Sequence, residues 1–183
     1  MKNKKWLLSL FILVAFIQLT VPIFMAWRWE DVLQTGRRFY WETAPVDPYD
    51  AFKGRYVALG FKENTLSGVN TEQLIGGQLV YAIIDENTEG KAYISGLSMV
   101  RPDSGYYIKA KAYAVGKDKV HVNLPFNRYY LPEELAAQAE TVYRESAGKQ
   151  SGVAAVRIKD GYGVVEQLYI GNKPLQEVLQ QTR

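Results

Sequence analysis

The architecture of the chain is decided by residues 6–27, WLLSLFILVAFIQLTVPIFMAW, which run for 22 residues without a charge. A helix needs about 20 apolar residues to cross a hydrocarbon core, so this stretch predicts a transmembrane anchor. Residues 1–5 form a basic tail with three lysines, which predicts a cytoplasmic N-terminus and an extracytoplasmic position for everything after Arg28. The edges of the anchor carry aromatic residues typical of the headgroup region: Trp6, Trp27 and Trp29.

A cleaved secretory signal is the alternative interpretation of this stretch. Such signals have an apolar core of about 7–15 residues and a cleavage site with small side chains. The core here is longer, and residues 24–29 (FMAWRW) place aromatic rings where a peptidase requires small residues. We therefore expect an uncleaved anchor at 6–27, followed by a juxtamembrane linker at 28–45 and an extracytoplasmic domain at 46–183.

Composition limits the chemistry of the outer part. The chain has 22 Lys and Arg against 19 Asp and Glu, and the three lysines of the tail account for the whole excess. The outer part is therefore neutral, and a basic surface for nucleic acid is not expected. The count of zero cysteines excludes disulfides, thiolate zinc sites and cysteine nucleophiles. We expect no cofactor and no bound metal.

Beyond the linker the pattern is that of short strands. In residues 55–61 (RYVALGF), Tyr56, Ala58 and Gly60 alternate with Val57, Leu59 and Phe61, which predicts a strand with two distinct faces. Further β-rich runs, separated by turn residues, cover 78–84, 92–100, 106–115, 120–124 and 128–131.

The C-terminal third adds a helix and a hairpin. Pro132 suits a first helical position and Gly148 a helix end, and an apolar stripe repeats at helical spacing between them. The turn at 159–161 (KDG) joins strands at 153–158 and 164–170, because Asp-Gly favours a type I′ hairpin turn. A short helix is expected at 174–181. The fold class is therefore α+β: one transmembrane helix, then a compact, mainly antiparallel β-rich domain with one or two helices.

Residues 46–61, VDPYDAFKGRYVALGF, resemble the signature of the bacterial GDYXXLXY family of membrane-anchored proteins. The family pattern is an Asp-Pro-x-Asp turn, a spacer, and Gly-Asp-Tyr-x-x-Leu-x-Tyr. The matching residues are Asp47, Pro48, Asp50, Gly54, Tyr56 and Leu59. Two positions depart from the pattern: Arg55 reverses the charge of the motif's Asp, and Phe61 lacks the hydroxyl of its final Tyr.

Two later segments extend the resemblance. Residues 127–133 (NRYYLPE) are similar to a late family block through Arg128, Tyr129, Pro132 and Glu133, and residues 153–175 resemble the family's closing hairpin. The resemblance implies anchoring in the bacterial inner (cytoplasmic) membrane and an unassigned activity. It also implies an integral membrane partner, since family genes often lie beside, or are fused to, genes for multi-spanning proteins.

The motif residues have both structural and functional interpretations. Asp47, Asp50 and Arg55 either stabilise a turn or surround a polar groove near the membrane. Residues 128–130 (RYY) either end a strand, with Arg128 pairing to a nearby acid, or belong to a recognition patch, because Tyr and Arg are over-represented among interface hot spots.

Other candidates for chemistry are weaker. The only histidine, His121, lies in a strand-like run without a nucleophile elbow. Residues 85–90 (DENTEG) imitate the start of a calcium loop, but Gly96 stands where its bidentate Glu is required, which favours a hairpin turn. Ser98 with Lys109 or Lys111 would supply a Ser-Lys pair like that of membrane-anchored signal peptidases, although its order in the chain is wrong.

The sequence thus favours a non-enzymatic accessory or interaction domain beside a membrane protein, with Asp47, Asp50, Arg55, Tyr56, Arg128 and Tyr129 as contact candidates. Two alternatives stay open: an envelope hydrolase, and a sensor that binds a small ligand among its 13 Tyr and 4 Trp.

Overall fold

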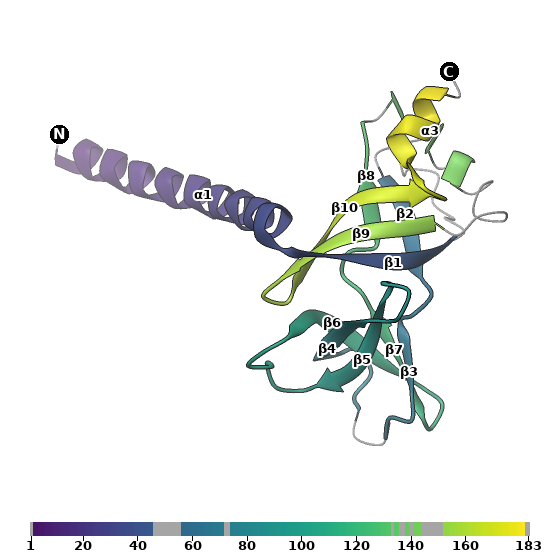
Figure 1. The fold of residues 1–183 in the computed structure, drawn as a ribbon. Helices are drawn as coiled ribbons and strands as arrows, with labels where there is room; N and C mark the ends of the chain where they lie inside the picture. Colours follow the sequence, from purple (N-terminus) through teal and green to yellow (C-terminus); the bar gives the residue numbers. More distant parts are fainter. Residues whose placement is uncertain are drawn as a thin grey trace.

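The computed structural model describes residues 2–45, 56–71, 74–132, 134–135, 138–139, 141–143 and 152–181. One long helix, α1 (Lys2–Thr35), projects away from a β-rich body made of two antiparallel sheets (Figure 1). The expected α+β architecture with a long N-terminal apolar helix is confirmed.

Helix α1 is, among the described residues, the one helix long and apolar enough to cross a membrane. Pro22 lies inside it without ending it. The hydroxyls of Ser9 and Thr20 donate to the carbonyls of Lys5 and Phe16, four residues earlier in each case. These bonds satisfy polar groups that would otherwise be unpaired in a hydrocarbon environment.

The larger sheet has six strands in the order β11-β10-β9-β1-β2-β8. Strand β1 lies at its centre, where it pairs with β9 from Arg37↔Ile158 to Thr43↔Gly152, and with β2 over Thr43–Pro45. The bounds are β1 Arg37–Pro45, β2 Tyr56–Phe61, β8 Arg128–Tyr130, β9 Gly152–Lys159, β10 Tyr162–Ile170 and β11 Lys173–Pro174.

The smaller sheet has five strands in the order β3-β7-β6-β4-β5. Their bounds are β3 Thr65–Ser67, β4 Gln78–Glu86, β5 Ala92–Ser98, β6 Tyr106–Val115 and β7 Lys119–Asn123. The two sheets touch where Ile108 of β6 bridges to Gly161, and where Tyr40 of β1 bridges to Lys91.

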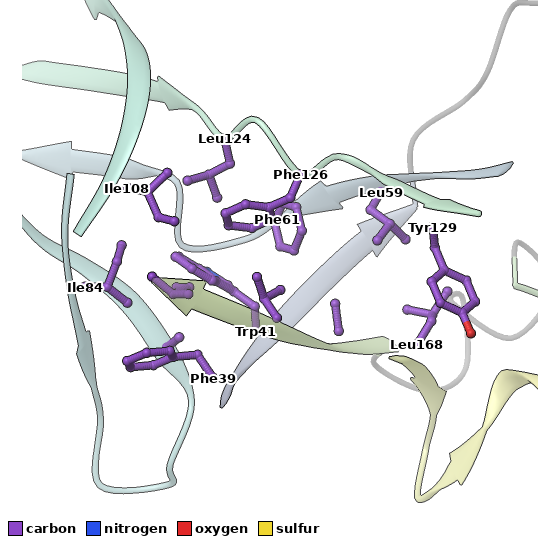
Figure 2. Packing of buried hydrophobic residues seen from close by; sticks show 14 of the residues in the cluster. Phe39, Trp41, Leu59, Phe61, Ile84, Ile108, Leu124, Phe126, Tyr129 and Leu168 are labelled. Atoms are coloured by element: carbon purple, nitrogen blue, oxygen red, sulfur yellow. The ribbon is translucent and has the colours of Figure 1, made fainter. Parts of the chain in front are cut away.

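One aromatic core joins the sheets. Trp41 is fully buried and packs against Phe61 and Phe126, with ring centroids 5.8 Å and 5.6 Å away. Figure 2 shows Trp41 facing these two rings, with Ile108 and Ile84 on one side and Leu59 and Leu168 toward the other. Large aromatic side chains bury much apolar area, so this cluster supplies a major part of the folding free energy.

The expected strands and turns agree with the structure. Residues 56–61 alternate between half-buried and buried, as the sequence pattern predicts. Asp160 and Gly161 both adopt positive φ, 51° and 83°, which is the requirement of a type I′ hairpin turn. Helix α3 (Leu175–Gln181) confirms the short C-terminal helix. The described residues between 134 and 143 are helical, and Ala139 and Tyr143 of the expected apolar stripe are buried.

The segment 28–45, expected as a linker, is ordered structure. Its first part completes α1 and its second part is β1, the central strand of the larger sheet. Gly36 forms the junction: its N–H donates to the Val32 carbonyl at 2.9 Å, and a Cβ there would lie 2.4 Å from that oxygen. The body therefore begins at Arg37 and not at residue 46.

Candidate interaction site

The outer face of the β2–β8 pair carries the exposed part of the family-like motifs. Tyr56 lies opposite Tyr130, and Ala58 opposite Arg128, in the antiparallel register. Because side chains alternate along a strand, Tyr56, Arg128 and Tyr130 share the outer face. We call these three residues the Tyr-Arg face.

Aromatic rings hold the arginine of this face. The Arg128 guanidinium carbon lies 4.7 Å from the centroid of the Tyr56 ring, and the Tyr56 and Tyr130 centroids are 5.7 Å apart. A hydrogen bond to Tyr130 raises the pKa of Arg128. Tyr130 is 65% exposed, and Arg128 has no ion pair with any carboxylate in the described part of the chain.

A groove of about 420 Å³ continues from the Tyr-Arg face to the helix. One wall is Trp29 of α1, and the opposite wall contains Asn127, Arg128 and Tyr130. Its remaining lining is Pro125, Phe126, Gly163, Val164 and Val165. Among the described residues, the lining has aromatic rings, one cation and no acidic side chain, so it is suited to a ligand with an apolar part and a negative charge.

The helix is fixed to the β9–β10 hairpin. The Trp29 and Tyr162 rings meet edge to face at 5.7 Å, and Lys159 Nζ donates to Asp31 Oδ2 and Thr35 Oγ1, each at 2.7 Å. Val32 is buried against the body. These contacts hold Trp29, and with it one wall of the groove, in a defined position.

A carboxylate between two arginines strengthens the same junction. Glu166 accepts hydrogen bonds from Arg38 at 2.7 and 2.6 Å and from Arg157 at 2.9 and 3.2 Å. Arg157 also donates to the Gly36 carbonyl at 2.9 Å, where α1 ends. These bonds, those from Arg38 first, lower the pKa of Glu166 to about 2, and they raise the pKa of Arg38.

The other sequence-predicted residues fall into three groups. Leu59, Phe61 and Tyr129 lie on the inner face of the larger sheet and are buried, so their side chains pack the core. Burial raises the pKa of Tyr129. Pro132 is exposed directly after β8. The following candidates lie outside the described residues: Asp47, Pro48, Asp50, Gly54, Arg55 and Glu133.

The anchor tryptophans differ in their surroundings. Trp6 and Trp27 are 67% and 64% exposed on the projecting part of α1. Trp29 is 43% exposed because it packs on Tyr162. Trp29 is a site residue that the sequence does not predict in this role, whereas Tyr130 belongs to the predicted recognition patch. The alternation along β8 puts Tyr130 and Arg128 on one face and Tyr129 on the other.

The Ser-Lys candidates share a sheet but are not adjacent. Ser98 on β5 is the register partner of Tyr81 on β4, and Tyr81 is in turn the partner of Lys109 on β6. Strand β4 therefore lies between Ser98 and Lys109. The Ser98 hydroxyl donates to the Val100 carbonyl at 2.6 Å. Lys111 lies opposite Leu79, two residues farther along β6.

His121 Nδ1 is 3.5 Å from the Thr65 hydroxyl. Residues 85–90 belong to the β4–β5 hairpin, with Asn87 Oδ1 accepting from the N–H groups of Glu89 and Lys91.

Comparison with known protein families decides the identity of the chain. The model of the GDYXXLXY protein family matches residues 18–168. The chain belongs to the GDYXXLXY family. No curated protein and no solved structure matches it.

The GDYXXLXY match starts inside α1. It therefore spans the helix–hairpin junction, the Tyr-Arg face and the groove between them. At the departure from the family pattern that the structure describes, Phe61 packs edge to face on Trp41 and Phe126. In this GDYXXLXY protein the motif's last aromatic position thus serves the core.

Proposed function

We propose that this GDYXXLXY protein is a single-pass accessory domain that docks on an integral membrane protein. In this proposal α1 is an uncleaved anchor in the bacterial cytoplasmic membrane, the basic tail is cytoplasmic, and both sheets are extracytoplasmic. The apolar span, the three lysines before it and the family membership support this arrangement.

The observation that carries the proposal is the groove between Trp29 and the Tyr-Arg face. Trp29 is two residues beyond the apolar run, so the groove opens at the height of the membrane surface. Its rings and its Arg128 are residue types that dominate interface energetics. Because the guanidinium lacks an acidic partner among the described residues, an acidic segment of the membrane partner would complete it.

Site-specific photo-crosslinking in native membranes tests the proposal. Benzoylphenylalanine at position 130, on the Tyr-Arg face, is expected to form an adduct with an integral membrane protein. Arg128→Glu is expected to reduce that adduct at least about tenfold, because like charges across an interface cost several kcal/mol. The matched control is the same probe at position 113, an exposed tyrosine of the smaller sheet. Equal adducts at both positions, or none at position 130, would contradict the proposal.

The orientation has an independent test. The chain lacks cysteine, so a single Glu89→Cys variant carries the only thiol. A membrane-impermeant maleimide is expected to label it in cells with a permeable outer surface and an intact cytoplasmic membrane. Labelling that requires lysis of the cytoplasmic membrane would place the sheets on the cytoplasmic side and refute the proposed topology.

The size of the groove favours a second candidate function, a small-ligand sensor. A volume of about 420 Å³ falls within the usual range of ligand pockets. A sensor would bind an aromatic or anionic metabolite in the purified protein, and Trp29 fluorescence would report it. Docking would be favoured by two results together. The probe at position 130 would form adducts only with a membrane protein, and the screened ligands would not change the fluorescence of the purified protein.

A further inference from the structure

A second group of cations lies on the other side of the helix–hairpin junction. The guanidinium carbon of Arg28 is 3.9 Å from the centroid of the Tyr162 ring, and Lys109 Nζ is 5.7 Å from the same centroid. Lys109 also lies 6.0 Å from the Tyr81 ring. Neither cation forms an ion pair with a carboxylate in the described ranges. Two cations from different elements therefore converge on one tyrosine.

The position of this group relative to the bilayer follows from α1. Arg28 is the first charged residue after the apolar run. The β9–β10 hairpin lies back along the helix, with Lys159 bonded to Asp31 and Thr35 and Tyr162 beside Arg28 (Figure 1). With about 1.5 Å of rise per residue, Tyr162 lies roughly 10 Å closer to the membrane than the end of α1 at Thr35. The ring and its two cations are thus at headgroup height.

An apolar tip accompanies the cations. Arg101 donates to Tyr107 Oη at 2.6 Å and to Asp160 Oδ1 at 3.3 Å, which ties its loop to the turn of the same hairpin. The preceding residue, Val100, is 74% exposed. An exposed valine beside basic and aromatic groups is typical of a surface that enters the membrane interface.

We propose that Arg28, Lys109, Tyr162 and Val100 form a lipid-binding face that holds anionic phospholipid headgroups of the leaflet from which α1 emerges. The two cations would donate to headgroup phosphate oxygens, Tyr162 would lie at the interface, and Val100 would enter the acyl boundary. Two nearby acids are already paired, Asp31 with Lys159 and Asp160 with Arg101, and Glu30 accepts a hydrogen bond from Gln34. The proposal rests on α1 spanning the membrane, but it does not depend on a docking partner.

The consequence is an orientation. With the lipid-binding face on the leaflet, the body leans against the membrane on the side of the hairpin and of β6. The Tyr-Arg face and its groove then open sideways, along the membrane plane, where an integral membrane protein would meet them.

The test uses the full-length protein in nanodiscs of phosphatidylcholine, with or without phosphatidylglycerol. A nitroxide on Val100→Cys reports contact with a water-soluble nickel chelate, and one on Val115→Cys is the matched control. Val115 is also an exposed valine, and it lies six residues, roughly 20 Å, beyond Lys109 on β6. We expect collision of the chelate with position 100 to fall at least about twofold when phosphatidylglycerol is present, and position 115 to be unchanged.

Charge reversal completes the test. Lys109→Glu is expected to restore chelate access at position 100, whereas Lys119→Glu, the same change on β7, is expected to have no effect. Equal access at positions 100 and 115, or protection unchanged by Lys109→Glu, would overturn the proposal. Loss of protection on addition of excess inorganic phosphate would show a free-anion site, which also overturns it. A protein that does not remain in the nanodisc would instead refute the membrane anchor itself.

Discussion

Two arginine sites on the larger sheet differ in what surrounds the charge. At the helix–hairpin junction, Arg38 and Arg157 share the Glu166 carboxylate, so each guanidinium has an ionic partner within the protein. On the Tyr-Arg face, Arg128 has two tyrosine rings and no described carboxylate. The first arrangement stabilises the joint between the helix and the sheet. In the docking proposal the second supplies a cation to the partner, so the two sites would serve folding and binding respectively.

The largest effect is expected from removing the shared carboxylate. Glu166→Gln leaves the half-buried Arg157 guanidinium and the more exposed Arg38 guanidinium facing each other without a counter-charge, and we expect a loss of about 2 kcal/mol in the free energy of unfolding. For a domain of this size, that corresponds to a decrease of about 4–8 °C in Tm. Thermal unfolding of the detergent-solubilised protein measures it. Glu89→Gln, in an exposed turn, is the control, and an equal effect of the two changes would remove the distinction between the sites.

The pH dependence should follow the same carboxylate. The pKa of Glu166 is about 2 in the folded protein, against an ordinary value of 4.5. A lowered folded pKa gives stability that is complete above the ordinary value and is lost as pH falls from about 4.5 toward 2. Between pH 7 and pH 3 we expect the stability difference between the native protein and Glu166→Gln to shrink by about 1 kcal/mol, allowing for solvent screening. A constant difference across this range would assign the effect to something other than the charge.

The joint can also be loosened at the hairpin. Tyr162→Ala removes the ring that contacts both Trp29 and Arg28, with an expected cost of about 1 kcal/mol. Spin labels at Glu30→Cys and Glu89→Cys should then show a broader distance distribution by pulsed electron resonance. Tyr113→Ala, which removes an exposed ring far from α1, should leave the distribution narrow. A narrow distribution in both variants would mean that Lys159 and Glu166 are sufficient to hold the helix.

The smallest effect on stability is expected at the binding region. Arg128→Ala should change the free energy of unfolding by less than about 0.5 kcal/mol, because the side chain is exposed and makes no described ion pair. The same substitution at Arg38 should cost about 1–2 kcal/mol. Chemical denaturation of the two variants compares them directly. A similar cost at both positions would mean that Arg128 is a structural residue and would weaken the docking proposal.

Much of the fold could be predicted from local patterns. The alternation in residues 56–61 and the Asp-Gly turn at 160–161 reflect side-chain period and backbone φ, which depend on neighbours in sequence. Residues 28–45 form helix and strand and not the expected linker, because residues 39–43 (FYWET) follow the helix without a turn cluster. In this strand the inward side chains, Phe39 and Trp41, alternate with Tyr40 and Glu42, which is the pattern typical of a strand.

The site was only partly predictable, because it depends on pairings between distant segments. The Tyr-Arg face requires the β2–β8 register, which brings Tyr56 beside Tyr130. The groove requires Trp29 to be held by Tyr162, a contact across more than 130 positions of the chain that no local pattern encodes. Tyr129 shows the converse error, since a residue expected at the surface lies on the inner side of its strand.

The central place of β1 has a consequence for how the protein is made. Arg37 and Ile158 are register partners, so the strand that directly follows α1 lacks its β9 partner until residues 152–159 have been synthesised. Pairing of segments so far apart in sequence slows folding. Phe39 and Trp41 can pack earlier against Tyr106, Phe61 and Phe126, so the aromatic core can form before the larger sheet is complete.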